Sequence, residues 1–249
     1  MHITPAARFL PSGDTALVVE FSDRIDRRVS ALVLTLAEKL DAAAIPGVIE
    51  VVPTFRSLMV HYEPLRLPQA ELRQRLGPLI EGMAATERDG RHWRLPACYD
   101  ESLGPDLADV AQRTGLSVHQ VVERHSATTF HVYMMGFLPG FPYLGDLPPE
   151  LELPRRESPR IKVPAGSIAI AMAMTSIYSL ESPGGWHLIG RTPVPLWDLR
   201  RDPPVLLAAG DKIIFEPISL REFEALTAKL TEGDYRIAPE AAPSSGTRA

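Results

Sequence analysis

The stretch from Pro154 to Pro195 constrains the fold of this chain more than any other stretch does. Proline and glycine recur along it at short intervals, and proline fixes φ and lacks a backbone N–H, so a long helix is excluded there. Its apolar centre, Ser167 to Met174, is predicted to form a strand. The chain has 24 prolines in 249 residues, about twice the usual share. We therefore expect the second half to consist of short strands joined by turns.

Composition and charge exclude several classes of protein. The formal net charge is −5 and no block of Lys or Arg occurs, which argues against nucleic-acid binding. Cys98 is the single cysteine, so an internal disulfide is impossible and a reducing compartment fits. No window approaches the roughly 20 apolar residues of a membrane span, and the N-terminal residues lack the apolar core of a signal peptide. We expect a soluble, cytoplasmic protein.

Residues 1–88 have the pattern of a small α+β domain. A hairpin is predicted to turn at Ser12–Asp14, and two amphipathic helices alternate with two strands. Both apolar stripes could pack on one sheet, which predicts a ferredoxin-like sandwich. The expected elements are the hairpin Phe9–Phe21, a helix over Asp26–Ala43, a buried strand over Val48–Val52, a strand over Ser57–Tyr62, and a helix from Pro68.

A polar, aperiodic segment at 86–92 marks a domain boundary, which divides the chain into residues 1–88, 89–236 and a disordered tail at 237–249. In the second domain, Asp106 is a candidate cap of a short helix. Ser117 with Gln120, and Ser219 with Glu222, form capping boxes that predict two further helices. Short strands and Pro/Gly turns predict a closed or nearly closed barrel. The expected strands are Trp93–Tyr99, Thr129–Met135, Ser167–Met174, Ile177–Leu180, His187–Gly190, Val205–Leu207 and Lys212–Glu216, with an irregular loop at Gly136–Lys162.

Common motifs for metal, serine-hydrolase or nucleotide sites are missing from the sequence. The seven histidines are scattered and no cysteine pair exists, so no metal site is expected. Ser182 is followed by proline and lacks the Gly-x-Ser-x-Gly pattern of a nucleophile elbow. Neither a Walker-type loop nor a Rossmann glycine pattern occurs.

The Gly-rich loop from Glu181 to Thr192 is the main candidate for a site. Gly184 and Gly185 would let backbone amides approach an anionic ligand closely. Arg191 offers a planar fork to a carboxylate, and Glu181 could orient it or act as an acid or base. The alternative is a structural hairpin with a Glu–Arg pair at the rim of the barrel.

Other candidates lie on either side of this loop. The window 154–164 contains four basic residues that could clamp an anion, although such runs are usually solvated. His125 would have its charged form favoured near a helix C-terminus, and a packed or capping histidine is the alternative. Aromatic rings, among them Trp186, could wall a pocket or form a small core. The candidate binding residues are Arg160, Lys162, Thr175, Tyr178, Gly184, Gly185 and Trp186, and the catalytic candidates are Glu181, Arg191 and His125.

Four long motifs make the chain resemble one family. They read GPDLADVAQRTGLS at 104–117, RHSATTFHVYMMGFLPGFPYLGDLP at 124–148, PRRESPRIKVPAGSIAIA at 154–171 and ESPGGWHLIGRTP at 181–193. The family includes the B subunit of bacterial ATP-dependent 5-oxoprolinase, also described as allophanate hydrolase subunit 1. It also includes the kinase A inhibitor KipI and subdomains C and D of the carboxyltransferase domain of urea carboxylase.

The resemblance implies a cyclophilin-like barrel after the α+β domain, and an enzyme that is active only with partner subunits C and A. Together the subunits would use ATP, which a partner could hold, to open 5-oxoproline to glutamate. Arg160, Lys162, Glu181 and Arg191 would then face a shared site for a small carboxylated lactam or amide.

One segment departs from the family pattern and keeps alternatives open. Thr175 and Tyr178 are retained, whereas Met174 stands where family members often carry Gln. Met cannot donate the hydrogen bonds of an amide, which would fit a changed substrate or another role. The alternatives are a regulator that inhibits a histidine kinase and an allophanate- or urea-type amidohydrolase subunit. Prolyl isomerase would follow from the barrel alone.

Overall fold

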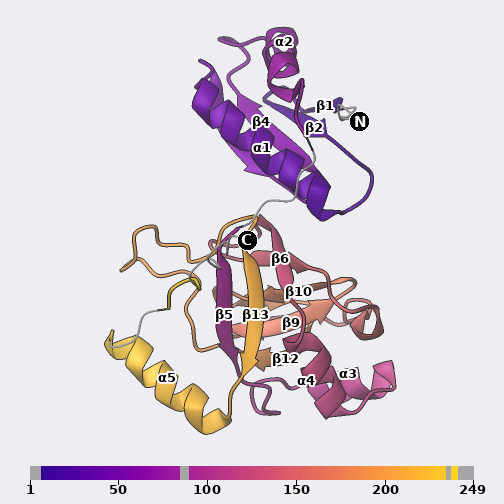
Figure 1. Cartoon of the computed structure of the whole chain (residues 1–249), viewed down its shortest axis with the longest axis vertical. Helices are drawn as coiled ribbons and strands as arrows, with labels where there is room; N and C mark the ends of the chain where they lie inside the picture. The colour runs from indigo at the N-terminus through magenta and orange to yellow at the C-terminus, as the bar shows by residue number, and fades with distance from the viewer. Residues whose placement is uncertain (1–6, 85–89, 234–236, 241–249) are drawn as a thin grey trace, which may run out of the picture. The chain divides into compact units, whose positions relative to one another are not determined.

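The computed structural model describes residues 7–84, 90–233 and 237–240 of the chain. The chain divides into two compact units, Met1–Asp89 and Gly90–Ala249. Figure 1 shows the first as a sheet with two helices and the second as a rolled sheet with helices around it. Each unit has an apolar core of its own, the property that lets a domain fold by itself.

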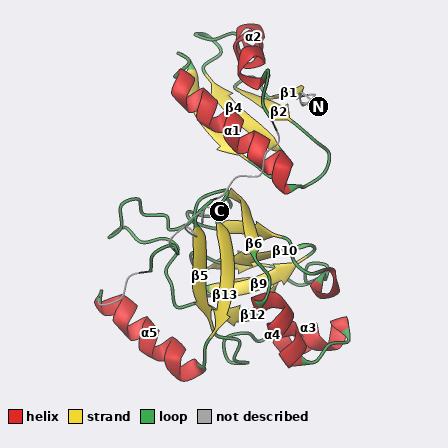
Figure 2. Ribbon diagram, viewed as in Figure 1, coloured by secondary structure: helices red, strands yellow, loops and turns green. Residues whose placement is uncertain are grey.

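A four-stranded antiparallel sheet forms the N-terminal unit, in the order β1-β2-β4-β3. Helices α1 and α2 share one apolar core with this sheet (Figure 2). The arrangement is ferredoxin-like, as predicted, with β1 in the place of the last strand of a β-α-β-β-α-β unit. The elements are β1 (Arg8–Ser12), β2 (Ala16–Glu20), α1 (Arg27–Ala43), β3 (Val48–Pro53), β4 (Ser57–Tyr62) and α2 (Gln69–Ile80).

Local signals fix the start and the buried face of α1. The carboxylate of Asp26 accepts hydrogen bonds from the backbone N–H groups of Arg28 and Val29, which caps the helix. The predicted apolar stripe is buried and includes Val33, Leu36 and Leu40.

The prediction that the strand after α1 is buried is wrong. β3 lies at the edge of the sheet, where it pairs with β4. Ile49 is 68% exposed, and Glu50 is exposed as well. A short β-rich run does not reveal whether a strand is central or at an edge, because β propensity depends on the neighbouring strands.

A seven-stranded sheet forms the C-terminal unit, in the order β12-β9-β10-β7-β6-β13-β5. Neighbours run antiparallel, except for the parallel pair β13 and β5. Cys98 and Arg191 join the two ends of the sheet through a pair of backbone hydrogen bonds of 2.8 Å each. The sheet is therefore a nearly closed barrel, as predicted. The strands are β5 (His92–Ala97), β6 (Phe130–Met135), β7 (Pro142–Gly145), β9 (Ser167–Ala171), β10 (Met174–Ile177), β12 (His187–Arg191) and β13 (Lys212–Pro217).

β9 is buried along its whole length because both of its faces are covered. Ile168 and Ile170 belong to the main core inside the barrel. Ala169 and Ala171 alternate with them and belong to a second apolar cluster outside the barrel. The strand at the centre of the Pro/Gly-rich stretch therefore separates two layers.

Four helical segments complete the described part of the C-terminal unit. Both predicted capping boxes are present, at Ser117 with Gln120 and at Ser219 with Glu222. Gly115 ends α3 in the left-handed conformation, which glycine adopts readily. The segments are α3 (Leu107–Thr114), α4 (Val118–Ser126), the single-turn η1 (Pro149–Leu151) and α5 (Leu220–Glu232).

The structure corrects several strand predictions, among them Ile177–Leu180, of which only Ile177 belongs to a strand. The run predicted as one strand over Ser167–Met174 is a hairpin, because Met172 turns the chain with a φ of 53° between β9 and β10. The loop predicted at Gly136–Lys162 contains β7 and part of another strand, since proline can stand at the first position of a strand. The strand predicted at Val205–Leu207 is reduced to a single bridge between Val205 and Trp197.

The stretch predicted as a tail from 237 begins with ordered contacts. Ile237 packs against the main core of the barrel. Glu240 donates its backbone N–H to the carbonyl of His92 at 2.7 Å, and its carboxylate accepts from Arg94 at 2.8 Å. The remaining tail residues, 241–249, lie outside the described residues.

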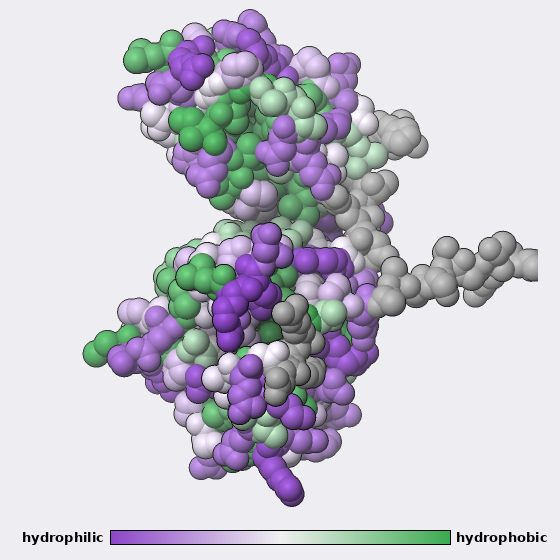
Figure 3. Space-filling model, turned by 90° about the vertical axis from the view of Figure 1, so that its left-hand side faces the viewer, coloured by the Kyte–Doolittle hydropathy of each residue, from purple (hydrophilic) through white to green (hydrophobic). Residues whose placement is uncertain are grey.

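None of the described helices has the length and apolar character that crossing a membrane requires. The face drawn in Figure 3 is mostly hydrophilic, with groups of hydrophobic residues among the hydrophilic ones. This agrees with a charged content of 23%.

Candidate functional site

A two-stranded ribbon lies against the outside of the barrel and carries Arg160, Lys162 and Gly184 of the predicted site residues, with Glu181 and Gly185 directly beside it. It pairs β8 (Arg160–Val163) with β11 (Ser182–Gly184) in antiparallel fashion. Val163 anchors the ribbon in the apolar cluster outside the barrel, which we call the outer cluster. The outer cluster consists of Phe141, Val163, Ala169, Ala171, Tyr178, Trp186 and Leu188.

Asp106 is the buried charge that ties this region together. Its Oδ1 accepts hydrogen bonds from Arg156 Nη1 at 2.8 Å and Arg160 Nη2 at 2.7 Å. Its Oδ2 accepts from Arg160 Nη1 at 2.8 Å and from the backbone N–H of Leu188 at 2.7 Å. These four bonds use the acceptor positions of a carboxylate, and the bidentate bond to Arg160 is the strongest type of pair.

The role predicted for Asp106 as a helix cap is therefore incorrect. The residue stands at the N-cap position of α3, but its side chain makes no capping hydrogen bond. Its carboxylate points instead to partners 50, 54 and 82 residues away in sequence, Arg156, Arg160 and Leu188.

Tyr178 and Trp186 form the aromatic part of the outer cluster. Tyr178 is buried, and the backbone N–H of Trp186 bonds to its hydroxyl. Burial raises the pKa of Tyr178, although the nearby charges of Arg155 and Arg160 act in the opposite direction. Tyr143 packs edge-on to Trp186, with ring centroids 6.2 Å apart. The arginines therefore lie close to buried aromatic rings.

Lys162 and Glu181 form an exposed ion pair on the ribbon. The Lys162 Nζ lies 2.8 Å from Glu181 Oε1, and both side chains are more than half exposed. The hydrogen bond from Glu181 raises the pKa of Lys162. The expectation that Glu181 orients Arg191 is therefore not met, because Glu181 is paired with Lys162.

Arg191 lies at the seam of the barrel. Its Nε donates to the carbonyl of Ala165 at 2.7 Å, and burial lowers its pKa. It is three residues along β12 from Leu188, which is about 10 Å in a strand. Arg191 is the last residue of β12, whereas the Asp106 carboxylate that holds Arg160 is bonded to Leu188 near the start of that strand.

His125 and Thr175 lie inside the barrel core, away from the ribbon. Thr175 Oγ1 donates to the carbonyl of Ala169 at 3.0 Å, so its lone pair accepts from His125 Nε2–H at 3.0 Å. The other ring nitrogen, Nδ1, then accepts from the Tyr99 hydroxyl at 2.8 Å. Burial lowers the pKa of His125 to about 3. The helix terminus does not keep this histidine charged, because the loss of solvation is the larger effect.

This burial corrects the roles assigned to both residues. His125 and Thr175 are each 0% exposed and bonded to the protein itself. A substrate cannot reach them without opening the core. His125 is therefore a buried, neutral histidine that packs in the core.

Gly184 is required by the close approach of Tyr178. A Cβ at Gly184 would lie 2.1 Å from the Tyr178 hydroxyl, whereas a Cβ at Gly185 would meet Pro159 at an ordinary 3.6 Å. Gly185 accepts a backbone hydrogen bond of 2.8 Å from Arg156. Gly184 thus lets the ribbon pack onto the outer cluster, whereas Gly185 is bonded to the basic run through its carbonyl.

Replacing Gly184 with alanine is expected to lower the free energy of unfolding by about 1–3 kcal/mol, because the added methyl group overpacks the outer cluster. The matched Gly185→Ala variant is expected to change it by less than about 0.5 kcal/mol. Urea unfolding followed by tryptophan fluorescence measures both. Equal losses in the two variants would show that Tyr178 moves aside freely.

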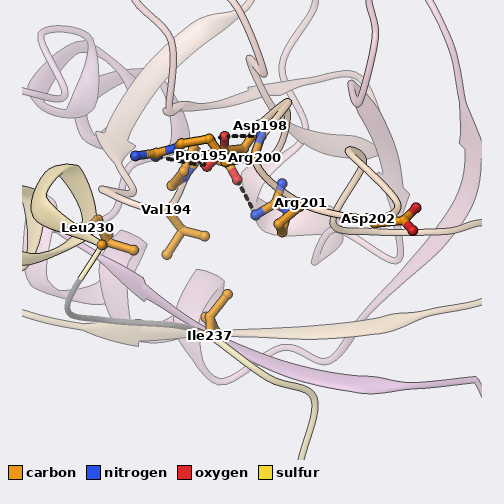
Figure 4. A pocket seen from close by; sticks show the side chains of 9 residues that line it. Val194, Pro195, Asp198, Arg200, Arg201, Asp202, Leu230 and Ile237 are labelled. Atoms are coloured by element: carbon orange, nitrogen blue, oxygen red, sulfur yellow. Dashed lines mark hydrogen bonds and ion pairs between the residues drawn. The ribbon is translucent and has the colours of Figure 1, made fainter.

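A pocket of about 370 Å³ lies elsewhere on the C-terminal unit, between the loop after β12, the end of α5 and Ile237 (Figure 4). Arg200 bonds to Asp198 and lowers the pKa of that carboxyl to about 2. Arg201 donates to backbone carbonyls of the same loop. None of the predicted site residues lines the pocket, and its arginines hold the loop together.

The part of the chain that the structure describes offers no cluster for a metal ion. There, no group of three or more His, Cys, Asp or Glu side chains could hold one.

Asp106 is the residue of this region that sequence reasoning missed as a member of a site. The dense basic run at 154–164 was a signal for a buried carboxylate partner. Spacing alone could not identify that partner, because Asp106 lies 50 residues before Arg156 in the sequence.

Known proteins share the sequence of both units. A family model described as carboxyltransferase domain, subdomain C and D, matches residues 7–207. The B subunit of 5-oxoprolinase from Bacillus subtilis (strain 168) is 36% identical over 227 residues, covering 86% of this chain and 93% of that protein. The same subunit from Escherichia coli O157:H7 is 42% identical over 214 residues, covering 85% and 96%.

A solved structure gives the same fold at low identity. The chain is similar to the K. lactis urea amidolyase with a TM-score of 0.80 and 19% identity, over 96% of this chain and 16% of that one. This likeness concerns the fold, and it confirms the α+β architecture with a nearly closed barrel.

Proposed function

Because this chain belongs to the family of carboxyltransferase domain subdomains C and D, we propose that it is the B subunit of a 5-oxoprolinase-type enzyme complex. The family resemblance of its four motifs is thereby confirmed. The observation that carries the proposal is the similarity to the Bacillus subtilis 5-oxoprolinase chain over 93% of its length. A subunit name implies a complex, so this chain functions together with other subunits.

The proposed reaction opens the lactam ring of 5-oxoproline to give glutamate. A lactam amide is a poor electrophile, and phosphorylation of its oxygen by ATP would activate it for attack by water. The reaction consumes one ATP and two water molecules: one water adds across the ring C–N bond to give glutamate, and the other accounts for the hydrolysis of ATP to ADP and phosphate. Cations and backbone donors at such a site stabilise the developing negative charge.

The ribbon is the surface of this chain that we assign to the shared site. Arg160, Lys162 and Glu181 are its charged groups that reach solvent, with side-chain exposures of 25%, 75% and 55%. Tyr178 and Trp186 belong to the outer cluster on which the ribbon packs, Gly184 is part of the ribbon, and Gly185 follows it. Arg191 would contribute from the far end of β12, and His125 and Thr175 are left out because they are buried.

ATP is assigned to a partner subunit. The sequence carries neither a Walker-type loop nor a Rossmann glycine pattern, the two motifs whose backbone N–H groups commonly bind nucleotide phosphates. Subunits C and A are the proposed partners. The ribbon would close a cavity together with one of them, which accounts for its exposed charges on a layer outside the barrel.

Reconstitution tests the proposal. The full chain is mixed with subunits C and A from the same source, and 5-oxoproline-dependent release of ADP is measured. Turnover is expected with all three subunits and none when this chain is omitted. A three-subunit mixture that hydrolyses allophanate but not 5-oxoproline would favour the amidohydrolase alternative instead.

The regulatory alternative predicts that the chain inhibits autophosphorylation of a histidine kinase. The enzyme proposal is preferred to it, because relatives that cover 85–86% of this chain are named as enzyme subunits.

A further inference from the structure

We propose that Asp106 is a positioning residue for an anion site: it holds the guanidinium groups of Arg156 and Arg160 side by side so that they bind the carboxylate of a small substrate. This inference rests on the proposed function, since it assigns the carboxylate of 5-oxoproline to these arginines. Asp106 itself does not contact the substrate.

The geometry of the bonds to Asp106 orients both arginines. Asp106 is 4% exposed and connects three separate segments, the start of α3, the basic run that enters β8, and β12. Its bidentate bond fixes the plane of the Arg160 guanidinium, and its third side-chain bond places Arg156 beside it. A guanidinium held in one orientation loses less freedom when a ligand binds, which favours affinity.

The charges around Asp106 do not balance. Arg156 and Arg160 share a single buried carboxylate, that of Asp106. Arg155 adds a further positive charge near Tyr178 and has no carboxylate partner within the described ranges. The two guanidinium groups bonded to one carboxylate leave a surplus positive charge that attracts an anion.

Both arginines remain accessible to a ligand. The side chains of Arg156 and Arg160 are 29% and 25% exposed, so their bonds to Asp106 do not bury them completely. Arg156 Nε is buried and has no hydrogen-bond partner among the described residues. Tyr178 and Trp186 form an apolar floor close by, which would face the ring of a lactam rather than its charged group.

The chemistry of the arginines favours a small carboxylate. Planar guanidinium forks match a carboxylate in bidentate fashion. A surplus of this size, on a chain with a net charge of −5, is too small for a polyanion such as nucleic acid. Inorganic phosphate has similar chemistry and is the competing ligand in the test.

The test uses Asp106→Asn in the reconstituted complex. Asparagine keeps the shape, but its one carbonyl oxygen accepts at most two of the four bonds, so the paired orientation of the two guanidinium groups is lost. The KM for 5-oxoproline is expected to rise about tenfold or more while kcat changes less than about twofold, since binding geometry is lost and not the chemistry. The KM for ATP should not change.

Asp109→Asn is the matched control. Asp109 lies on the same helix, its side chain is 50% exposed, and it lies near Arg113 and His187, outside the arginine cluster. The KM for 5-oxoproline of the complex that contains the Asp109→Asn variant is expected to stay within about twofold of the wild type. Equal KM values for the Asp106 and Asp109 variants would overturn the inference.

Arg160→Lys covers the case in which Asp106→Asn does not fold. Lysine keeps the charge but loses the fork, so the KM for 5-oxoproline should again rise about tenfold, and an unchanged KM would overturn the inference.

A separate measurement distinguishes this inference from the proposed function. If the wild-type complex does not turn over 5-oxoproline, the proposed function fails. Binding of 5-oxoproline and of inorganic phosphate to the full chain is then compared between wild type and Arg156→Gln by calorimetry. Loss of 5-oxoproline binding in the variant supports the site, whereas equal binding, no binding to either protein, or a preference for phosphate contradicts it.

Discussion

Replacing Asp106 with alanine lowers the free energy of unfolding of the C-terminal unit by about 3 kcal/mol. The substitution leaves two guanidinium groups without their counter-charge and the backbone N–H of Leu188 without its acceptor. The loss is at the low end for a broken buried ion pair because Arg156 and Arg160 are each about a quarter exposed and can turn toward solvent.

Urea unfolding followed by tryptophan fluorescence measures this loss in the correct unit, because Trp93, Trp186 and Trp197 all lie in the C-terminal unit. Asp109→Ala is the control, and its half-exposed side chain is expected to contribute less than about 0.5 kcal/mol. If both variants lose the same free energy, the Asp106 network does not hold the ribbon in place.

Lowering the pH from 7 to 4 destabilises the barrel by about 3 kcal/mol through His125 alone. The folded state keeps this histidine neutral, with a pKa lowered to about 3 by burial, whereas the unfolded chain binds the proton near the ordinary value of 6.5. The unfolded state therefore binds more protons across this range. Stability is complete above pH 6.5 and falls as the pH drops toward 3.

His125→Gln is expected to remove this part of the pH dependence, although it also lowers stability at pH 7 because the bonds to Tyr99 and Thr175 change. The readout is the slope of the unfolding free energy between pH 7 and 4. His119→Gln, on the exposed side of the same helix, should keep the wild-type slope. A wild-type slope in the His125 variant would mean that this histidine is protonated in the folded state.

Elements with local signals could be predicted from the sequence. Asp26 and the two capping boxes satisfy nearby backbone N–H groups, so their effect depends on residues within three positions. The stripe of α1 repeats at helical spacing and is visible in the sequence alone. The nearly closed barrel followed from the density of short strands and turns.

Errors arose where a distant contact decides the outcome. Ile49 is exposed because its strand lies at the sheet edge, a property of the whole sheet. Met172 turns the chain in the left-handed conformation, which is unusual for a residue that is not glycine. The apolar run around it therefore did not predict a hairpin. Side-chain type alone could not separate buried His125 from an accessible histidine.

In the candidate site, too, the local grouping of residues could be predicted, whereas contacts between distant residues could not. The sequence grouped residues that the fold does bring together, since Arg160, Lys162, Glu181, Gly184 and Trp186 all lie on or beside the ribbon. It did not identify the pairing. Glu181 bonds to Lys162 rather than to the arginine that was expected, and the buried acid of the cluster comes from a residue 54 positions before Arg160.

Hydrogen–deuterium exchange of the full chain, alone and with subunits C and A and 5-oxoproline, tests most directly whether the ribbon faces the shared site. Slower exchange is expected in peptides that cover 154–164 and 181–187, because the partner and the substrate would shield these backbone amides. Protection confined to the 194–204 loop and α5, with the ribbon unchanged, would contradict the account.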